Sequence, residues 1–422
     1  MMRKRLTAVL CAVLMMTGCD GNKQEFIMTT TAQTSEVMTE AVKTEHPSAV
    51  RDIDPEAAAH GAEGMPYHFS ADNCQVEFAP LSEAATVNGR YIMHNNVCYL
   101  GFTCSCVSFR MTGDRVEAVM VSNGGVYSER QQGWVGVMID GELVDRIRLE
   151  DGEHSYVLYE GELDNAEVSI MKLSENQMAS TGIKSITCNA SSVSPIAEKP
   201  LKIEVIGDSI TCGYGNEAQS PADGMDTAQQ NGAATYGYLT ARNLDADWSL
   251  VCISGIGLIS DYTDTEGQKE NYLLVGDMYD YADANFQMRR GYDELTSWDF
   301  GRGSDVVVIN IGTNDYSYTG EDEELQYEFN EAYYDFIGHV REKNPQAYII
   351  CTLGIMGAEL YGQIEAAAEA YRIDTGDEKV YTMKFDYQKE KDGYGGDYHP
   401  TVKTHEKAAE KLTEYIRTVL YG

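Results

Sequence analysis

The stretch LKIEVIGDSITCGYGNE, residues 201–217, joins a short apolar run to a serine in a glycine-rich turn. Residues 201–206 have the character of a buried strand, and a helix is expected to open beyond Ser209. A serine placed there presents its hydroxyl to the crevice at the end of the strand, and its backbone N–H can face a developing oxyanion. By itself Gly207-Asp208-Ser209 is a weak signal, because serine at a strand end commonly caps a helix or forms a turn.

Apolar runs and helical stretches alternate over the rest of residues 198–422. This rhythm predicts a parallel sheet between two layers of helices, an α/β/α sandwich of flavodoxin-like winding. Ligands bind such sheets at the carboxyl ends of the strands. Further strands are expected at 249–253, 305–311, 347–352 and 380–385, and helices near 233–244, 322–343, 362–371 and 404–420.

The preceding residues, 65–195, have a different rhythm. Short apolar runs about a dozen residues apart are separated by turn signals such as Asn88-Gly89 and Asp140-Gly141, with no helical pattern of useful length. Many short strands with this spacing predict a β-sandwich domain, of jelly-roll type. The sequence leaves open whether this domain binds glycans or only buttresses its neighbour.

The amino terminus has the pattern of an export signal. Three basic residues in the first five precede the apolar run 6–16, which is shorter than the 20 or so residues that span a bilayer. The run ends in Met16-Thr17-Gly18-Cys19, which resembles a bacterial lipobox, so residues 1–19 are predicted to be a lipoprotein signal with Cys19 as the lipidated residue. Ordinary signal cleavage, with Cys19 incidental, is the alternative. Residues 20–64 lack apolar periodicity and are expected to form a tether.

Composition narrows the classes of partner. The chain carries 67 acidic against 32 basic residues, a net charge of −35, which would repel a phosphate backbone and excludes nucleic-acid binding through a basic patch. A hydrophobic share of 43% excludes wholesale disorder. The close pair Cys104-Ser105-Cys106 has no CxxC or histidine cluster beside it, so a zinc site is not expected, and most thiols are expected to be buried.

Two further expected strands end in residues that suit an acyl-transfer site. Ser254-Gly255-Ile256-Gly257 follows the second strand, where glycine lets the backbone approach a substrate closely or simply builds a tight turn. Asn314 follows the third strand, where its amide can donate to an oxyanion or form an Asx-turn.

The fourth segment is Gly395-Gly396-Asp397-Tyr398-His399-Pro400, just before the last helix. Three histidines lie in the α/β domain, at positions 339, 399 and 405. His339 falls within a helix and His405 in the first turn of another, whereas His399 lies in the glycine-rich loop and is the best candidate base for Ser209. A loop histidine is otherwise an ordinary surface residue, and His405 is the second candidate.

Serine, glycine, asparagine and histidine at successive strand ends resemble the four sequence blocks of the SGNH hydrolase superfamily, over residues 201–422. The run 206–217, the segments 182–186, 298–300 and 397–400, and the jelly-roll domain are similar to carbohydrate esterase family 2, over roughly residues 65–422.

The resemblance implies a catalytic role for several of these residues. Ser209 is the nucleophile and His399 the general acid and base, while the Ser209 N–H, the Gly257 N–H and the Asn314 side chain form the oxyanion hole. It implies no metal or organic cofactor. Tyr316, Tyr398 and Trp298 lie in or near the motif loops, where they either stack on sugar rings or pack.

One position departs from the superfamily pattern. Many SGNH enzymes place an orienting aspartate three residues before the histidine, where this chain has Gly396; Asp397 is two before it. Members of the resembled family can work as a Ser–His dyad with a backbone carbonyl holding the imidazole. Asp397 therefore contributes its carboxylate, its carbonyl or only loop structure, and Asp208 is expected to brace the loop.

With the predicted export signal, the resemblance implies a cell-surface esterase that removes acetyl groups from plant cell-wall polysaccharide, xylan or glucomannan, through an acyl-enzyme. The alternatives are an esterase for other acyl groups, lipase-like or acting on acetylated peptidoglycan, and a non-catalytic carbohydrate-binding protein. A monomer is expected, touching the membrane only through the lipid on Cys19.

Overall fold

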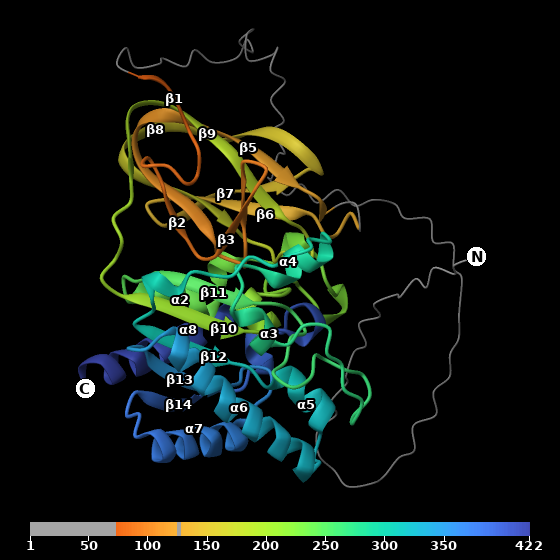
Figure 1. Cartoon of the computed structure of the whole chain (residues 1–422). Helices are drawn as coiled ribbons and strands as arrows, with labels where there is room; N and C mark the ends of the chain where they lie inside the picture. The colour runs from red at the N-terminus through yellow and green to blue at the C-terminus, as the bar shows by residue number, and fades with distance from the viewer. Residues whose placement is uncertain (1–72, 125–127) are drawn as a thin grey trace, which may run out of the picture. The chain divides into compact units, whose positions relative to one another are not determined.

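Two β-sheets organise the part of the chain that the computed structural model describes, residues 73–124 and 128–422 (Figure 1). The predicted signal and tether, including Cys19, lie outside these residues. The first sheet is antiparallel and ends at Pro195, and the second is parallel and begins at Lys202. The sequence predicts a jelly-roll β-sandwich domain followed by a flavodoxin-like α/β/α domain, and this fold class is confirmed.

The β-domain contains nine strands in the order β3-β4-β9-β5-β8-β6-β7, with β1 on β9 and β2 on β5. Three of them, β5, β8 and β9, are much longer than the short runs expected. Register shifts near Gly113 let β5 bend while it stays paired with β8 and β9. The strands are β1 (Cys74–Phe78), β2 (Thr86–Asn88), β3 (Tyr91–His94), β4 (Val97–Leu100), β5 (Cys106–Ser122), β6 (Gly133–Ile139), β7 (Glu142–Leu149), β8 (Gly152–Lys172) and β9 (Thr181–Pro195).

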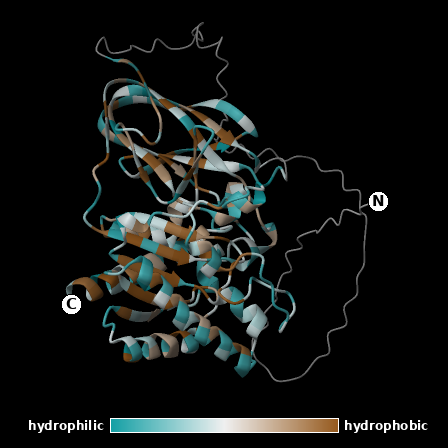
Figure 2. Ribbon diagram, in the orientation of Figure 1, coloured by the Kyte–Doolittle hydropathy of each residue, from teal (hydrophilic) through white to brown (hydrophobic). Residues whose placement is uncertain are grey.

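The α/β domain, which follows the β-domain, has a five-stranded parallel sheet in the order β11-β10-β12-β13-β14, which is flavodoxin-like. Its three central strands are buried on both faces, and apolar residues concentrate along the sheet (Figure 2). Each lies within three residues of its predicted position. The strands are β10 (Lys202–Gly207), β11 (Asp247–Cys252), β12 (Val306–Asn310), β13 (Tyr348–Leu353) and β14 (Val380–Lys384).

Helices cover both faces of this sheet. One face packs its side chains, such as Ile206 and Ile309, against α3, α6 and α7, and the other packs Val205 and Val308 against α2 and α8. The helices are α1 (Ser209–Cys212), α2 (Tyr236–Asn243), α3 (Val275–Tyr279), α4 (Ala284–Arg289), α5 (Thr313–Thr319), α6 (Glu323–Lys343), α7 (Tyr361–Thr375) and α8 (Val402–Tyr421). Among the described residues, none of these helices has the length and apolar character to cross a membrane.

A fully buried arginine joins the two domains at the amino end of the parallel sheet. Arg90 pairs with Glu204 on β10 at 3.3 Å and donates to the carbonyls of Tyr279 and Tyr281. The Tyr279 hydroxyl donates to the second Glu204 oxygen at 2.7 Å. A buried charge pair of this kind is costly to break, because one charge would remain unpaired in the interior.

The cysteines of the described ranges behave as small apolar residues. All eight are free, and all except Cys74 are buried, which confirms the expectation for most of the thiols. Burial raises the pKa of Cys106 and of Cys351 to about 12, so these thiols stay protonated and unreactive at neutral pH.

Candidate active site

The nucleophile candidate lies at the first position of a four-residue helix directly after β10. Asp208 caps this helix, because its carboxylate accepts a hydrogen bond from the Ile210 N–H at 2.9 Å. Gly207 has no room for a side chain, since a Cβ would lie 1.9 Å from Thr211 Oγ1. The tight turn places Ser209 at the carboxyl edge of the sheet, and Asp208 braces the loop as expected.

His399 reaches this serine from the loop before α8. Its Nε2 lies 2.8 Å from Ser209 Oγ, and its Nδ1 lies 3.0 Å from the carbonyl oxygen of Gly396. A carbonyl only accepts hydrogen bonds, so Nδ1 carries the proton and Nε2 presents its lone pair to the serine hydroxyl. This is the tautomer that a general base for Ser209 requires.

The environment keeps this imidazole neutral. Burial lowers the pKa of His399 to about 4, against the backbone hydrogen bond to Gly396 and the negative charge of Asp397, which raise it. His399 is therefore able to accept a proton at neutral pH.

The Asp397 carboxylate binds Tyr214, whose ring contacts His399, and not the histidine itself. Its carboxylate accepts a hydrogen bond from the Tyr214 hydroxyl at 2.6 Å, and the Tyr214 ring lies against the imidazole with centroids 4.3 Å apart. The Gly396 carbonyl occupies the place of the orienting aspartate. Of the roles left open by the sequence, the structure therefore supports a dyad held by a backbone carbonyl, with the Asp397 carboxylate bound to Tyr214.

Two glycines let the serine and histidine loops touch through their backbones. The Gly396 N–H donates to the Gly215 carbonyl at 2.9 Å. Gly215 has φ +53°, and a Cβ there would lie 2.9 Å from Gly396 Cα. Any side chain at this position would push the two loops apart.

Asn314, in the first turn of α5, lies next to the loop after β11 that contains Gly257. The Asn314 Nδ2 donates one hydrogen to the Ile256 carbonyl at 2.8 Å, which fixes the amide and leaves its second N–H available. Gly257 admits no side chain, since a Cβ would lie 1.8 Å from the Ser260 carbonyl oxygen. Burial raises the pKa of the nearby Asp261 to about 6, and backbone N–H groups, that of Gly257 among them, oppose this shift.

Asp315 holds the same loop, a role that the sequence did not reveal. Its buried carboxylate accepts from the N–H groups of Leu258 and Ile259 at 2.8 and 2.7 Å, and from that of Ser260 at 3.2 Å. Burial raises the pKa of Asp315 to about 6, although these N–H groups oppose the shift. Its only sequence signal is that it follows Asn314, since its partners lie 55 to 57 residues away.

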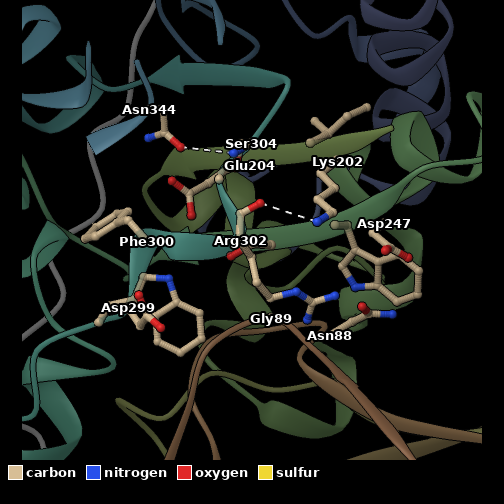
Figure 3. Close-up of a pocket in the computed structure, with 15 residues that line it drawn as sticks. Asn88, Gly89, Lys202, Glu204, Asp247, Asp299, Phe300, Arg302, Ser304 and Asn344 are labelled. Carbon is tan, nitrogen blue, oxygen red and sulfur yellow. Dashed lines mark hydrogen bonds between the residues drawn. The ribbon is translucent and has the colours of Figure 1, made fainter. Parts of the chain in front are cut away.

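The predicted aromatic contacts divide into two groups. Tyr398 is 37% exposed beside His399, and its ring lies 5.8 Å from that of Tyr394. Tyr316, in α5, donates its hydroxyl to Glu321 at 2.6 Å. Trp298, in contrast, lines an open pocket with residues from the amino ends of the strands, among them Lys202 and Asp247 (Figure 3).

This placement puts Trp298 at the opposite end of β10 from Ser209, beside Lys202, which begins the strand. Its predicted contact with a substrate bound at Ser209 has no support in the structure. The alternative base, His405, is fully buried in α8, where its Nδ1 accepts the Tyr236 N–H at 3.2 Å and its ring stacks on that tyrosine. His405 is thus a packing residue.

Known proteins resemble the chain along both domains. The family model described as GDSL-like lipase/acylhydrolase matches residues 203–412, and the one described as carbohydrate esterase 2 N-terminal matches residues 87–195. The cellulase/esterase CelE of Acetivibrio thermocellus is 38% identical over 234 residues, which cover 53% of this chain and 26% of that much longer protein.

Two further comparisons extend over most of the chain. The acetylxylan esterase / glucomannan deacetylase of Cellvibrio japonicus is 29% identical over 325 residues, or 76% of this chain and 84% of that protein. The structure of a family two carbohydrate esterase from Clostridium thermocellum in complex with cellohexaose has 29% identity and a TM-score of 0.69, over 80% of this chain and 99% of the other.

Proposed function

The chain belongs to the family 2 carbohydrate esterases, a group of GDSL-like acylhydrolases, and on this premise we propose that it removes O-acetyl groups from plant cell-wall polysaccharide. One observation carries the proposal: the Ser209 hydroxyl lies 2.8 Å from a neutral imidazole whose other nitrogen is fixed by the Gly396 carbonyl. This pair can transfer an acyl group without a third side chain.

Catalysis proceeds in two halves. Ser209 Oγ attacks the acetyl carbonyl carbon as His399 Nε2 takes its proton, and the resulting imidazolium then gives that proton to the departing sugar oxygen. The acetyl group remains on Ser209. Water, deprotonated by His399, then attacks the acetyl-enzyme, and acetate leaves as Oγ recovers the proton.

The oxyanion hole lies at the carboxyl edge of the sheet. The Ser209 N–H, the Gly257 N–H and the free N–H of the Asn314 amide are the proposed donors to the tetrahedral oxyanion. A preorganised donor of this kind contributes roughly 10²–10³ to the rate.

The proposed substrate class follows from the relatives and from the charge. The Cellvibrio relative is named for xylan and glucomannan, and the Clostridium structure holds cellohexaose. A net charge of −35 suits largely neutral glycans better than anionic ones. Tyr398, exposed beside His399, is the proposed stacking surface for a sugar ring, with Tyr316 further along the edge.

The proposed location is the outer face of the bacterial membrane, with lipidated Cys19 as the anchor and residues 20–64 as the tether. The basic start, the short apolar run and the small residue before Cys19 support this proposal. Metabolic labelling with a fatty-acid analogue would mark the wild-type chain and leave Cys19→Ala unlabelled; equal labelling would exclude Cys19.

Acetate release tests the proposed activity. Acetylated xylan, acetylated glucomannan and acetylated peptidoglycan are incubated with the wild type, Ser209→Ala and His399→Ala. Release by the wild type from either plant polysaccharide, with release abolished in Ser209→Ala and at least about 10³-fold slower in His399→Ala, is expected. Preferential release from peptidoglycan would transfer the function to the alternative esterase. No acetate release from any of the three substrates, or equal release by Ser209→Ala, would exclude the proposed esterase activity.

A further inference from the structure

The loop between β8 and β9 of the β-domain places the Glu175 carboxylate among the segments that follow β10 and β11. Glu175 is 1% exposed. Its carboxylate accepts from the Ser254 N–H at 2.9 Å and from the Ser254 hydroxyl at 2.6 Å. It also accepts from the Cys212 thiol at 3.7 Å and from the Gln230 amide at 3.5 Å. Glu175 is therefore in contact with the loop that follows β11 and with α1, the helix that begins at Ser209.

All four partners of Glu175 are donors, which matches the acceptor-only character of an ionised carboxylate. Burial raises the pKa of Glu175, and its hydrogen bonds to Ser254, Cys212 and Gln230 lower it. The loop is anchored as well by the buried Lys172, whose Nζ donates to Ala179 and Thr181 at 3.0 and 3.1 Å. In a Glu175→Gln variant, the side-chain NH₂ group would face groups that are themselves hydrogen-bond donors, so hydrogen bonds made by the carboxylate would be lost.

Ser254 begins a segment, residues 254–260, that is fixed at both ends. At one end Glu175, from the β-domain, holds Ser254. At the other end Asp315, from the hydrolase domain, accepts the N–H groups of 258–260. Between them lie Gly257 and the Ile256 carbonyl that orients Asn314. Two buried carboxylates, one from each domain, thus define the position of two proposed oxyanion donors.

We infer that Glu175 is a positioning residue for the oxyanion hole, so that the β-domain completes the active site of the hydrolase domain. The inference deepens the proposed function and rests on it for the role of the donors. It assigns the β-domain a part in the chemical step, because a catalytic donor displaced by about 1 Å loses on the order of 10² in rate.

The test compares Glu175→Gln with a matched control, Glu204→Gln. Both residues are buried glutamates at the contact between the domains, but Glu204 pairs with Arg90 at the amino end of β10, away from Ser209. Steady-state kinetics on 4-nitrophenyl acetate give kcat and KM for each. A fluorophosphonate probe gives the rate of Ser209 phosphonylation, in which Oγ bonds to phosphorus, fluoride leaves and the phosphoryl oxygen occupies the oxyanion hole. Thermal melting reports on folding.

We expect Glu175→Gln to lower kcat and the phosphonylation rate roughly 10- to 100-fold with KM within about twofold, since the donors act on the transition state. Glu204→Gln should retain both rates within about twofold, whatever it does to the melting temperature. Rates of Glu175→Gln within about twofold of the wild type, or an equal loss in both variants, would overturn the inference.

Two provisions keep the outcomes distinct. If Glu175→Gln does not fold, Ser254→Ala removes only the hydroxyl donor to Glu175, and a phosphonylation rate equal to the wild type's would then count against the inference. If the wild type releases no acetate from any substrate, the proposed function fails, but phosphonylation of Ser209 still measures what Glu175 contributes.

Discussion

Replacement of Asp397 by asparagine separates two kinds of serine esterase site. In a Ser-His-Asp triad, the aspartate accepts the imidazole Nδ1–H, and its conversion to asparagine lowers kcat by ~10⁴-fold. In this chain Nδ1 is satisfied by the Gly396 carbonyl, and the Asp397 carboxylate accepts from Tyr214. The asparagine variant keeps an oxygen able to accept the same hydroxyl, so the imidazole should retain its tautomer.

The expected loss in rate follows from the weaker hydrogen bond between Tyr214 and a neutral side chain at position 397. A hydrogen bond to a charged acceptor contributes about 1 kcal/mol more than one to a neutral acceptor, which corresponds to roughly fivefold in rate if it is all expressed in the transition state. The negative charge of Asp397 also raises the pKa of His399. Its removal should therefore move the acid limb of the pH profile to lower pH.

The assay is kcat/KM for acetate release by Asp397→Asn over a range of pH, with Tyr214→Phe and His399→Ala in parallel. We expect Asp397→Asn and Tyr214→Phe each to lose no more than about tenfold, and His399→Ala to lose at least about 10³-fold. A loss of 10³-fold or more in Asp397→Asn with Tyr214→Phe nearly unaffected would identify Asp397 as a triad carboxylate and refute the dyad.

Three further predictions concern the same loops. Burial lowers the pKa of His399 to about 4, so the base is neutral above that pH. The value of kcat/KM should therefore rise through about pH 4 and stay level to pH 7. A rise centred at pH 6.5 or above would contradict the lowered pKa of His399. Asn314→Ala should lower kcat by about 10²–10³ with the melting temperature little changed, and a loss below fivefold would exclude it as an oxyanion donor. Gly215→Ala should lower both stability and kcat through its contact with Gly396, whereas Gly376→Ala, at φ +71° with no atom within 4 Å of the new Cβ, should lower only stability. Equal kcat in the two glycine variants, measured on folded protein, would argue against that contact.

The fold and the proposed catalytic pair could be predicted from the sequence because both depend on local signals. Each strand of the parallel sheet is a short apolar run. The serine, glycine and asparagine motifs follow three of these strands closely, and the histidine motif lies between the last strand and the last helix. Since parallel strands end at one edge, chain order alone predicted that Ser209 and His399 would meet, although they are 190 residues apart.

What sequence could not supply were the side-chain contacts between loops. Glu175 meets Ser254 across 79 residues and Tyr214 meets Asp397 across 183, and neither pair has a periodic or spacing signature. Trp298 belongs to a family-like segment, yet it follows no strand end and lines the pocket at the amino ends of the strands. The bends in β5 depend on register with β8 and β9, which a single strand's pattern does not contain.

The most direct test of the account is to trap the covalent intermediate. Wild-type protein is mixed with acetylated xylo-oligosaccharide or 4-nitrophenyl acetate, quenched in acid during turnover, digested and analysed by mass spectrometry. The account predicts a single acetyl group on the peptide that contains Ser209, lost again in substrate-free buffer and never formed in Ser209→Ala. Acetate release without any acetyl-Ser209, or with the acetyl group on another residue, would contradict it.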